Sequence, residues 1–222
     1  MSLTAEIAVD HVLLAVEDLP AGAARMRDEH GLTALPGGRH PGAGTANMIV
    51  PLGSSYLELI TCVDPQEAAT NPLSRRVTGA LERGSLLAAW AVRVPDLGRV
   101  DARLRELGMA STGIREGSRR RPDGAVLRWR SLPVGEGLDP AIPFFIQWDL
   151  EECDYPGAAE VAHPAGRVSL AGVRATSPRP RELVELVSQL AGATLPLEVT
   201  SAPAQALTEV VLSVDGQVKP IR

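Results

Sequence analysis

Two stretches of the chain share one pattern, and this duplication limits the folds that are open to it. Residues 14–19 (LAVEDL) correspond to residues 92–97 (VRVPDL), and each is followed by apolar residues spaced three and four apart up to a glycine, Gly31 or Gly108. The apolar run predicts a strand, the aspartate before the helical spacing predicts a helix start, and the glycine predicts its end. The sequence therefore predicts one strand–turn–helix unit twice.

Each predicted helix is followed by turn residues and two further apolar runs. In the first copy these runs are 45–51 and 56–61, and in the second copy they are 125–132 and 142–148. Apolar runs bounded by Gly, Pro and Ser indicate strands that are joined by turns. Both copies are therefore expected to continue from helix to sheet.

A shorter third element follows residue 150. Apolar runs at 169–174 and 208–214 predict strands, and residues 180–190 predict a helix whose broad apolar stripe packs on a sheet. The resulting division is a first module at 1–63, a connector at 64–84, a second module at 85–150 and a C-terminal element at 151–222.

The composition restricts the partners and the location. A net charge of −5 argues against nucleic acid as a partner, because a phosphate backbone requires a clustered basic face. No apolar stretch approaches the roughly 18 residues that a membrane span needs. The N-terminal residues lack a basic region followed by an apolar core, and Cys62 and Cys153 are too few for a disulfide framework. We therefore expect a cytoplasmic protein with free thiols.

Two polar residues lie inside apolar strand patterns. His11 lies within 9–16 (VDHVLLAV) and Glu58 within 56–60 (YLELI). An ionised carboxylate between two leucines is costly to bury unless a cation, a proton or a hydrogen-bond donor compensates it. We therefore expect the strand face that carries Glu58 to line a pocket. The alternatives are a hydrogen-bonded core histidine and a buried structural ion pair.

As far as Leu150, these residues resemble the glyoxalase-like branch of the vicinal oxygen chelate superfamily. The resemblance rests on DHV at 10–12, GRHPGAGTAN at 38–47, YLEL at 56–59, SRRRPDG at 118–124 and FFIQWD at 144–149. It implies an α+β fold of paired βαβββ modules whose curved mixed sheets enclose a cleft, with a shorter C-terminal βα-β element. In the catalytic members it also implies a divalent metal at the floor of the cleft.

The resemblance assigns candidate metal ligands as well. Each module is expected to supply one ligand near the start of its first strand and another on its last, which gives His11 and Glu58 in the first module. In the second module the shared Asp–Leu step places Ala89 opposite His11, and the last strand places Gln147 opposite Glu58. Alanine donates no electron pair, and a glutamine oxygen is a poorer ligand than a carboxylate. A divalent metal would need His40, His163 or water in addition, and a metal-free site is left open.

Further polar and aromatic side chains are candidates for contact with a ligand. Proton transfer is expected from His11, Glu58 and His40, and an arginine can clamp a carboxylate with two parallel hydrogen bonds. For the loop histidines and arginines the alternative is a solvated surface position, and for the tryptophans it is the core, which we favour for Trp148. The substrate-binding candidates are Arg39, Asn47, Arg119, Arg121, Trp129, Gln147 and His163.

These residues favour a glyoxalase-like small-molecule enzyme that acts on a carbonyl-containing substrate as an isomerase, lyase or hydrolase. With a metal, polarised substrate oxygens would stabilise an enolate-like transition state, and without one His11 and Glu58 would form an acid/base pair. The alternative is a non-catalytic protein of the same fold that binds or sequesters a small molecule. The expected partner is a small-molecule ligand, and a homodimer is left open.

Overall fold

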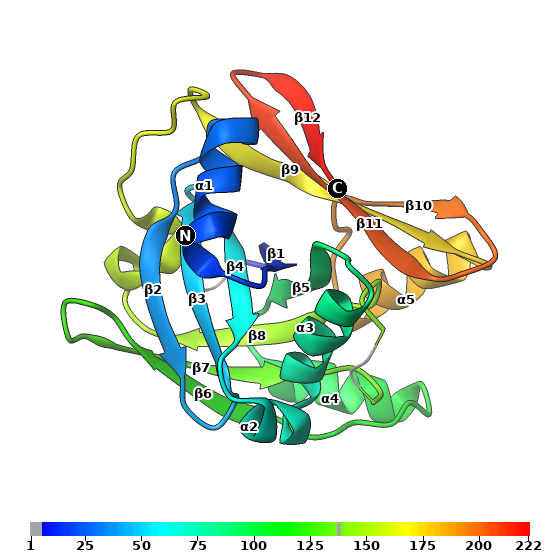
Figure 1. Cartoon of the computed structure of the whole chain (residues 1–222). Coiled ribbons are helices and arrows are strands. Elements are labelled where there is room, and N and C mark those ends of the chain that lie inside the picture. Colours follow the sequence, from blue (N-terminus) through cyan, green and yellow to red (C-terminus); the bar gives the residue numbers. More distant parts are fainter. Residues whose placement is uncertain (1–5, 137–138) are drawn as a thin grey trace.

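The computed structural model describes residues 6–136 and 139–222, which form two sheets with helices packed on them (Figure 1). Three successive groups of elements each run in the order strand, helix, three strands. The first group is β1 (Ala8–Ala15), α1 (Leu19–His30), β2 (Leu35–His40), β3 (Thr45–Pro51) and β4 (Tyr56–Cys62). The second is β5 (Leu87–Arg93), α4 (Leu97–Glu106), β6 (Arg115–Arg120), β7 (Val126–Leu132) and β8 (Phe144–Asp149). The third is β9 (Val168–Ser177), α5 (Pro180–Ala191), β10 (Leu197–Ser201), β11 (Ala206–Val214) and β12 (Gln217–Ile221).

The first two groups form one curved sheet of eight strands in the order β2-β3-β4-β1-β5-β8-β7-β6. Within each group the first strand pairs in parallel with the last, and β1 pairs with β5 antiparallel where the groups meet. The two outer strands approach each other, because a Cβ atom at Gly38 of β2 would lie 2.4 Å from the carbonyl oxygen of Arg120 on β6. The predicted α+β fold of paired βαβββ modules around a cleft is confirmed.

The helix boundaries follow from the residues that the duplication singles out. Asp18 caps α1 by accepting a hydrogen bond from the Ala21 amide at 2.8 Å, and Asp96 caps α4 in the same way. Gly31 ends α1 with a left-handed backbone at φ 65°, which glycine adopts without steric penalty. The repeated Asp–Leu step therefore marks the start of a helix in both modules.

The eight-stranded sheet packs on both of its faces. Its outer face, with Val12 and Leu14 of β1, shares one apolar core with the second sheet and with α5. Its inner face, with Leu13 of β1, packs against Val77 and Ala80 of α3 (Pro72–Glu82). The short helix α2 (Pro65–Thr70) precedes α3. Because side chains alternate along a strand, the inward positions of β1 are left to face the space enclosed by the curved sheet.

The C-terminal element is larger than the expected βα-β unit. Its sheet has four strands in the order β10-β9-β11-β12, and the sequence patterns had predicted neither β10 nor β12. Both are five residues long and mostly exposed, so they lack the apolar run that marks a buried strand. In the chain segment from β8 to β9 there are two short 3-10 helices, η2 (Glu152–Asp154) and η3 (Pro156–Ala158). In the described part of the chain, no helix is long and apolar enough to cross a membrane.

Candidate functional site

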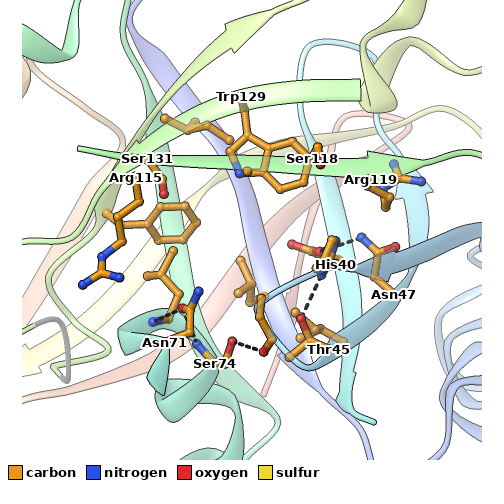
Figure 2. A pocket seen from close by; sticks show the side chains of 18 of the residues that line it. His40, Thr45, Asn47, Asn71, Ser74, Arg115, Ser118, Arg119, Trp129 and Ser131 are labelled. Atoms are coloured by element: carbon orange, nitrogen blue, oxygen red, sulfur yellow. Dashed lines mark hydrogen bonds and ion pairs between the residues drawn. The ribbon is translucent and has the colours of Figure 1, made fainter. Parts of the chain in front are cut away.

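A cavity of about 290 Å³ lies inside the curved sheet. Its inner wall is formed by inward-facing residues of both modules, and Asn71 and Ser74 of the connector lie at its edge opposite Trp129 of β7 (Figure 2). The connector, which the sequence marks only as a link between modules, thus forms part of the cavity wall. His11 and Glu58 both line the cavity.

His11 and Glu58 meet at the floor of this cavity. They lie on the parallel neighbours β1 and β4, and the Nε2 atom of His11 is 3.4 Å from Oε2 of Glu58. Both residues are buried, with 3% and 6% of their surfaces exposed. The imidazole stacks on the ring of Tyr56 at 4.5 Å between centroids, and the edge contact with Phe144 is 5.5 Å. The predicted convergence of these two residues in one cavity is therefore present in the structure.

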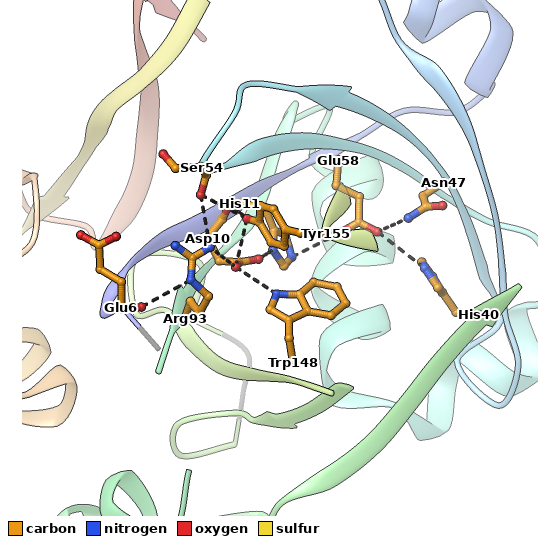
Figure 3. Close-up of polar contacts among 10 residues, drawn as sticks. All are labelled: Glu6, Asp10, His11, His40, Asn47, Ser54, Glu58, Arg93, Trp148 and Tyr155. Atoms are coloured by element: carbon orange, nitrogen blue, oxygen red, sulfur yellow. Dashed lines mark hydrogen bonds and ion pairs between the residues drawn. The ribbon is translucent and has the colours of Figure 1, made fainter. Parts of the chain in front are cut away.

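Asp10 fixes the orientation of His11 from behind. Its Oδ1 atom is 2.6 Å from Nδ1 of His11, and its Oδ2 atom accepts hydrogen bonds from Arg93, Trp148 and Tyr155 at 3.0–3.1 Å (Figure 3). Burial, followed by the charge of Asp10, raises the pKa of Tyr155 well above its usual value, so the phenol keeps its proton and donates it. Asp10 thus accepts hydrogen bonds on both carboxylate oxygens. Because it has no proton to donate, the proton of its hydrogen bond with His11 lies on Nδ1 of the imidazole.

A β-bulge turns Asp10 toward His11. The pairing of β1 with β5 shifts register between Val9 and His11, where Asp10 is the extra residue. Bulges of this kind change the direction of one side chain within a strand. The sequence pattern of alternating faces gave no indication of this residue, of Arg93 or of Tyr155, although all three are buried. An aspartate next to a strand histidine was the only available signal.

The second oxygen of Glu58 faces the other end of the cavity. Its Oε1 atom accepts a hydrogen bond from the Asn47 side chain at 2.6 Å, and the Nε2 atom of His40 lies 3.7 Å away. The Nδ1 atom of His40 is 2.8 Å from the Thr45 hydroxyl. Burial lowers the pKa of His40, the charge of Glu58 opposes this, and the charges of Arg119 and His11 add to it. The structure therefore brings His40 and Asn47 together with His11 and Glu58.

Two candidates from the second module also line the cavity. Arg119 of β6 lies beside Asn47, and Trp129 of β7 contacts the edge of the His40 ring at 5.8 Å between centroids (Figure 2). Trp148, which the sequence analysis favours as a core residue, lines the cavity as well and donates to Asp10. The second module therefore contributes two tryptophan rings to the cavity lining.

The remaining candidates lie elsewhere, which corrects the expectation that their side chains reach the cavity. Arg39 is exposed and pairs with Asp64 and Glu67, because its side chain points outward from β2. Arg121 pairs with Asp123 and Asp154 beyond the end of β6. These two arginines are part of solvated charge networks at the surface.

His163 and Gln147 use their polar atoms in structural contacts. The Nδ1 atom of His163 accepts from the Thr33 amide at 3.0 Å, and its Nε2 atom is 2.7 Å from the Pro51 carbonyl oxygen. Gln147 accepts from the Leu97 amide at 3.2 Å, so its side chain lies at the start of α4. Neither side chain lines the cavity, and neither supplies a further ligand beside His11.

The strand register of the second module shows that Gln147 is not the counterpart of Glu58. The Val16 amide donates to the Ile60 carbonyl, and the Val94 amide donates to the Ile146 carbonyl in the same way. Counting back two residues from each carbonyl makes Phe144 the equivalent of Glu58. The counterpart of His11 is still Ala89, so the two metal-ligand positions of the second module hold an alanine and a phenylalanine.

This donor set does not fit an ion held by protein side chains from both modules. Members of the superfamily often use divalent metals. His11 and Glu58 offer two donor atoms, whereas the side chains of Ala89 and Phe144 offer none. Within residues 6–136 and 139–222, no group of three or more His, Cys, Asp or Glu side chains is arranged to hold a metal ion.

Comparisons with known proteins agree with this architecture. A family model described as a glyoxalase-like domain matches residues 9–191, which extends past the second module to the end of α5. A hypothetical protein from Staphylococcus aureus has the same fold, with a TM-score of 0.73 and 14% identity over 93% of this chain and 91% of that one.

Two other similar structures are epimerases. Methylmalonyl-CoA epimerase from Mycobacterium tuberculosis is 20% identical over 67% of this chain and 91% of its own, with a TM-score of 0.46. Methylmalonyl-CoA epimerase in complex with methylmalonyl-CoA and NH4+ is 17% identical over 63% of this chain and 93% of its own, with a TM-score of 0.47. Among curated proteins, none matches the sequence.

Proposed function

Because the chain belongs to the glyoxalase-like domain family of the vicinal oxygen chelate superfamily, we propose that it is a small-molecule enzyme that transfers a proton next to a carbonyl group. The family supports a small-molecule enzyme or binder. The observation that carries the more specific proposal is the 3.4 Å approach of His11 to Glu58 in the wall of the cavity. A paired imidazole and carboxylate is a common arrangement for general acid–base catalysis.

The protons of this pair follow from its hydrogen bonds. Asp10 holds the proton on Nδ1 of His11, so the Nε2 atom of a neutral imidazole presents a lone pair toward Glu58. Asn47 donates to the other oxygen of Glu58 and holds the carboxylate in place. Since Nε2 and Oε2 are both acceptors in this state, the pair has room for one proton from a substrate.

The reaction is an abstraction and return of that proton. The C–H bond next to the carbonyl breaks, Glu58 or His11 takes the proton, and the electron pair moves onto the carbonyl oxygen to form an enolate. His40, Ser118 and Ser131 are among the residues lining the cavity that can donate a hydrogen bond to such an oxygen. Return of the proton to the same or to a neighbouring atom gives an isomerisation, and loss of a leaving group gives a lyase reaction. No step is assigned to a metal, because the two modules do not supply a matching donor set.

Hydrogen–deuterium exchange tests the proposal directly. In D2O, wild-type protein is expected to accelerate the loss of the ¹H NMR signal next to the carbonyl of 2-oxo-4-phenylbutanoate or 4-phenylbutan-2-one. Glu58→Gln keeps the shape but removes the carboxylate of the acid–base pair, and it should lower the rate by a factor of about 10²–10⁴. The control is Glu198→Gln on the second sheet, where the carboxylate is exposed and pairs with Arg174.

The result also separates the enzyme from a binding protein. Exchange no faster than in buffer, together with saturable binding of either compound, would favour sequestration and contradict catalysis. The observation that favours this second candidate is that the counterparts of His11 and Glu58 are Ala89 and Phe144, whose side chains add no acid, base or metal ligand to the pair. For location we propose the cytoplasm, where the free thiols Cys62 and Cys153 would stay reduced.

A further inference from the structure

Among the buried charged side chains that line the cavity, one has no partner within the described residues. Arg119 lies on β6 with 5% of its surface exposed, and it lines the cavity. Within the described residues, no hydrogen bond or ion pair connects its guanidinium group to another group. Its stem passes over Gly38 of β2, where a Cβ atom would lie 3.1 Å from its Cγ atom. The absence of a side chain at Gly38 therefore leaves room for the arginine between the two sheet edges.

A charged side chain that is 5% exposed has lost most of its contact with water, and its surroundings show what could replace that contact. Burial lowers the pKa of Arg119, while the nearby Tyr56 and Glu58 raise it. An arginine keeps its charge at neutral pH even so, and it presents five N–H donors. By contrast, the buried Arg93 forms an ion pair with Asp10 at 3.1 Å. The cavity thus has a fixed positive group that no described carboxylate neutralises by contact.

We propose that Arg119 binds a carboxylate group of the substrate, so that the substrate class is a small oxo-carboxylic acid with an apolar body. A guanidinium group and a carboxylate match each other through two parallel hydrogen bonds, which compensates the charge in a buried site. The aromatic walls at Trp129 and Phe144 would pack against the apolar part. The inference rests on the proposed function, because it takes this cavity as the substrate site.

Matched ligands test this substrate class. 2-Oxo-4-phenylbutanoate and 4-phenylbutan-2-one share the phenyl chain and the ketone, and they differ by a carboxylate in place of a methyl group. Calorimetric titration of wild-type protein at pH 7 is expected to show at least about tenfold tighter binding of the acid. In Arg119→Gln the ratio of the two affinities should fall close to one, while binding of the neutral ketone is retained.

The control variant is Arg121→Gln, which removes a nearby arginine that lies outside the cavity and pairs with Asp154. It should keep the wild-type preference for the acid. Equal affinities in wild-type protein, or an unchanged preference in Arg119→Gln, would overturn the proposal. Because titration measures binding alone, an acid preference that depends on Arg119 but occurs without deuterium exchange would refute the proposed catalysis and leave the carboxylate site standing.

Discussion

The two βαβββ modules have the same fold but carry different kinds of side chain at equivalent positions of their first and last strands. At equivalent positions the first module carries Asp10, His11 and Glu58, and the second carries Ala88, Ala89 and Phe144. The second module shows that small and apolar residues are enough to build these strands. The polar residues of the first module are therefore not required by the fold, and their burial makes sense as a feature of the site.

Making the first module resemble the second at Asp10 should have the largest effect. Asp10→Ala leaves the charge of Arg93 buried without its carboxylate, and removal of one partner from a buried pair typically lowers the free energy of unfolding by about 3–5 kcal/mol. Urea denaturation checks this value. The double variant Asp10→Ala/Arg93→Met should regain part of the loss, and a loss of equal size in both variants would show that the ion pair is not its cause.

Making the second module resemble the first should create a metal site. The double variant Ala89→His/Phe144→Glu adds an imidazole and a carboxylate at the equivalents of His11 and Glu58. Zn²⁺ at 100 times its dissociation constant should then stabilise the protein by about 2.7 kcal/mol, visible as a rise in the melting temperature. Ala89→His alone supplies one ligand fewer and should respond less. A response of the double variant no larger than that of wild-type protein would contradict the equivalence of the two pairs.

The smallest expected effect concerns pH and the histidine of the first module's outer strand. Burial lowers the pKa of His40 below its usual value near 6.5, so the unfolded state takes up a proton first as the pH falls. The contribution of His40 to the free energy of unfolding is therefore fully present above pH 6.5 and is lost as the pH falls below it. The free energy of unfolding changes by at most about 1.4 kcal/mol per pH unit from this one group. Melting temperatures from pH 8 to pH 5 should fall less in His40→Gln than in wild-type protein. Identical slopes in the two proteins would contradict the prediction, since His30, whose pKa burial also lowers, is present in both.

The comparison of modules also explains which features the sequence could predict. The repeated Asp–Leu step predicted both helices and the paired modules, because helix caps are local signals of residue type and spacing. His11 and Glu58 could be predicted to meet, since each is a polar residue on an apolar strand face. These signals need only the residues that carry them and their neighbours in the chain.

Strand register and bulges depend on contacts between distant segments. The sequence alone matches Gln147 to Glu58 across a loop of different length, whereas the strand pairing and the hydrogen bond from Val94 to Ile146 identify Phe144 as the equivalent residue. The strand pattern does not indicate the bulge at Asp10 either, so it does not predict that this carboxylate orients His11. Arg39 and Arg121 were placed by proximity in sequence to the cavity loops, whereas nearby carboxylates draw both to the surface.

Tyr155 belongs to the chain beyond the second module, yet its hydroxyl group lies 3.1 Å from Asp10 and 3.2 Å from the backbone carbonyl of that residue. A protein shortened to its two duplicated halves would keep every strand of the large sheet and still lose one of the anchors behind the imidazole. The residues that supply every strand of the large sheet and the residues that supply the complete reaction centre therefore span different lengths of this polypeptide.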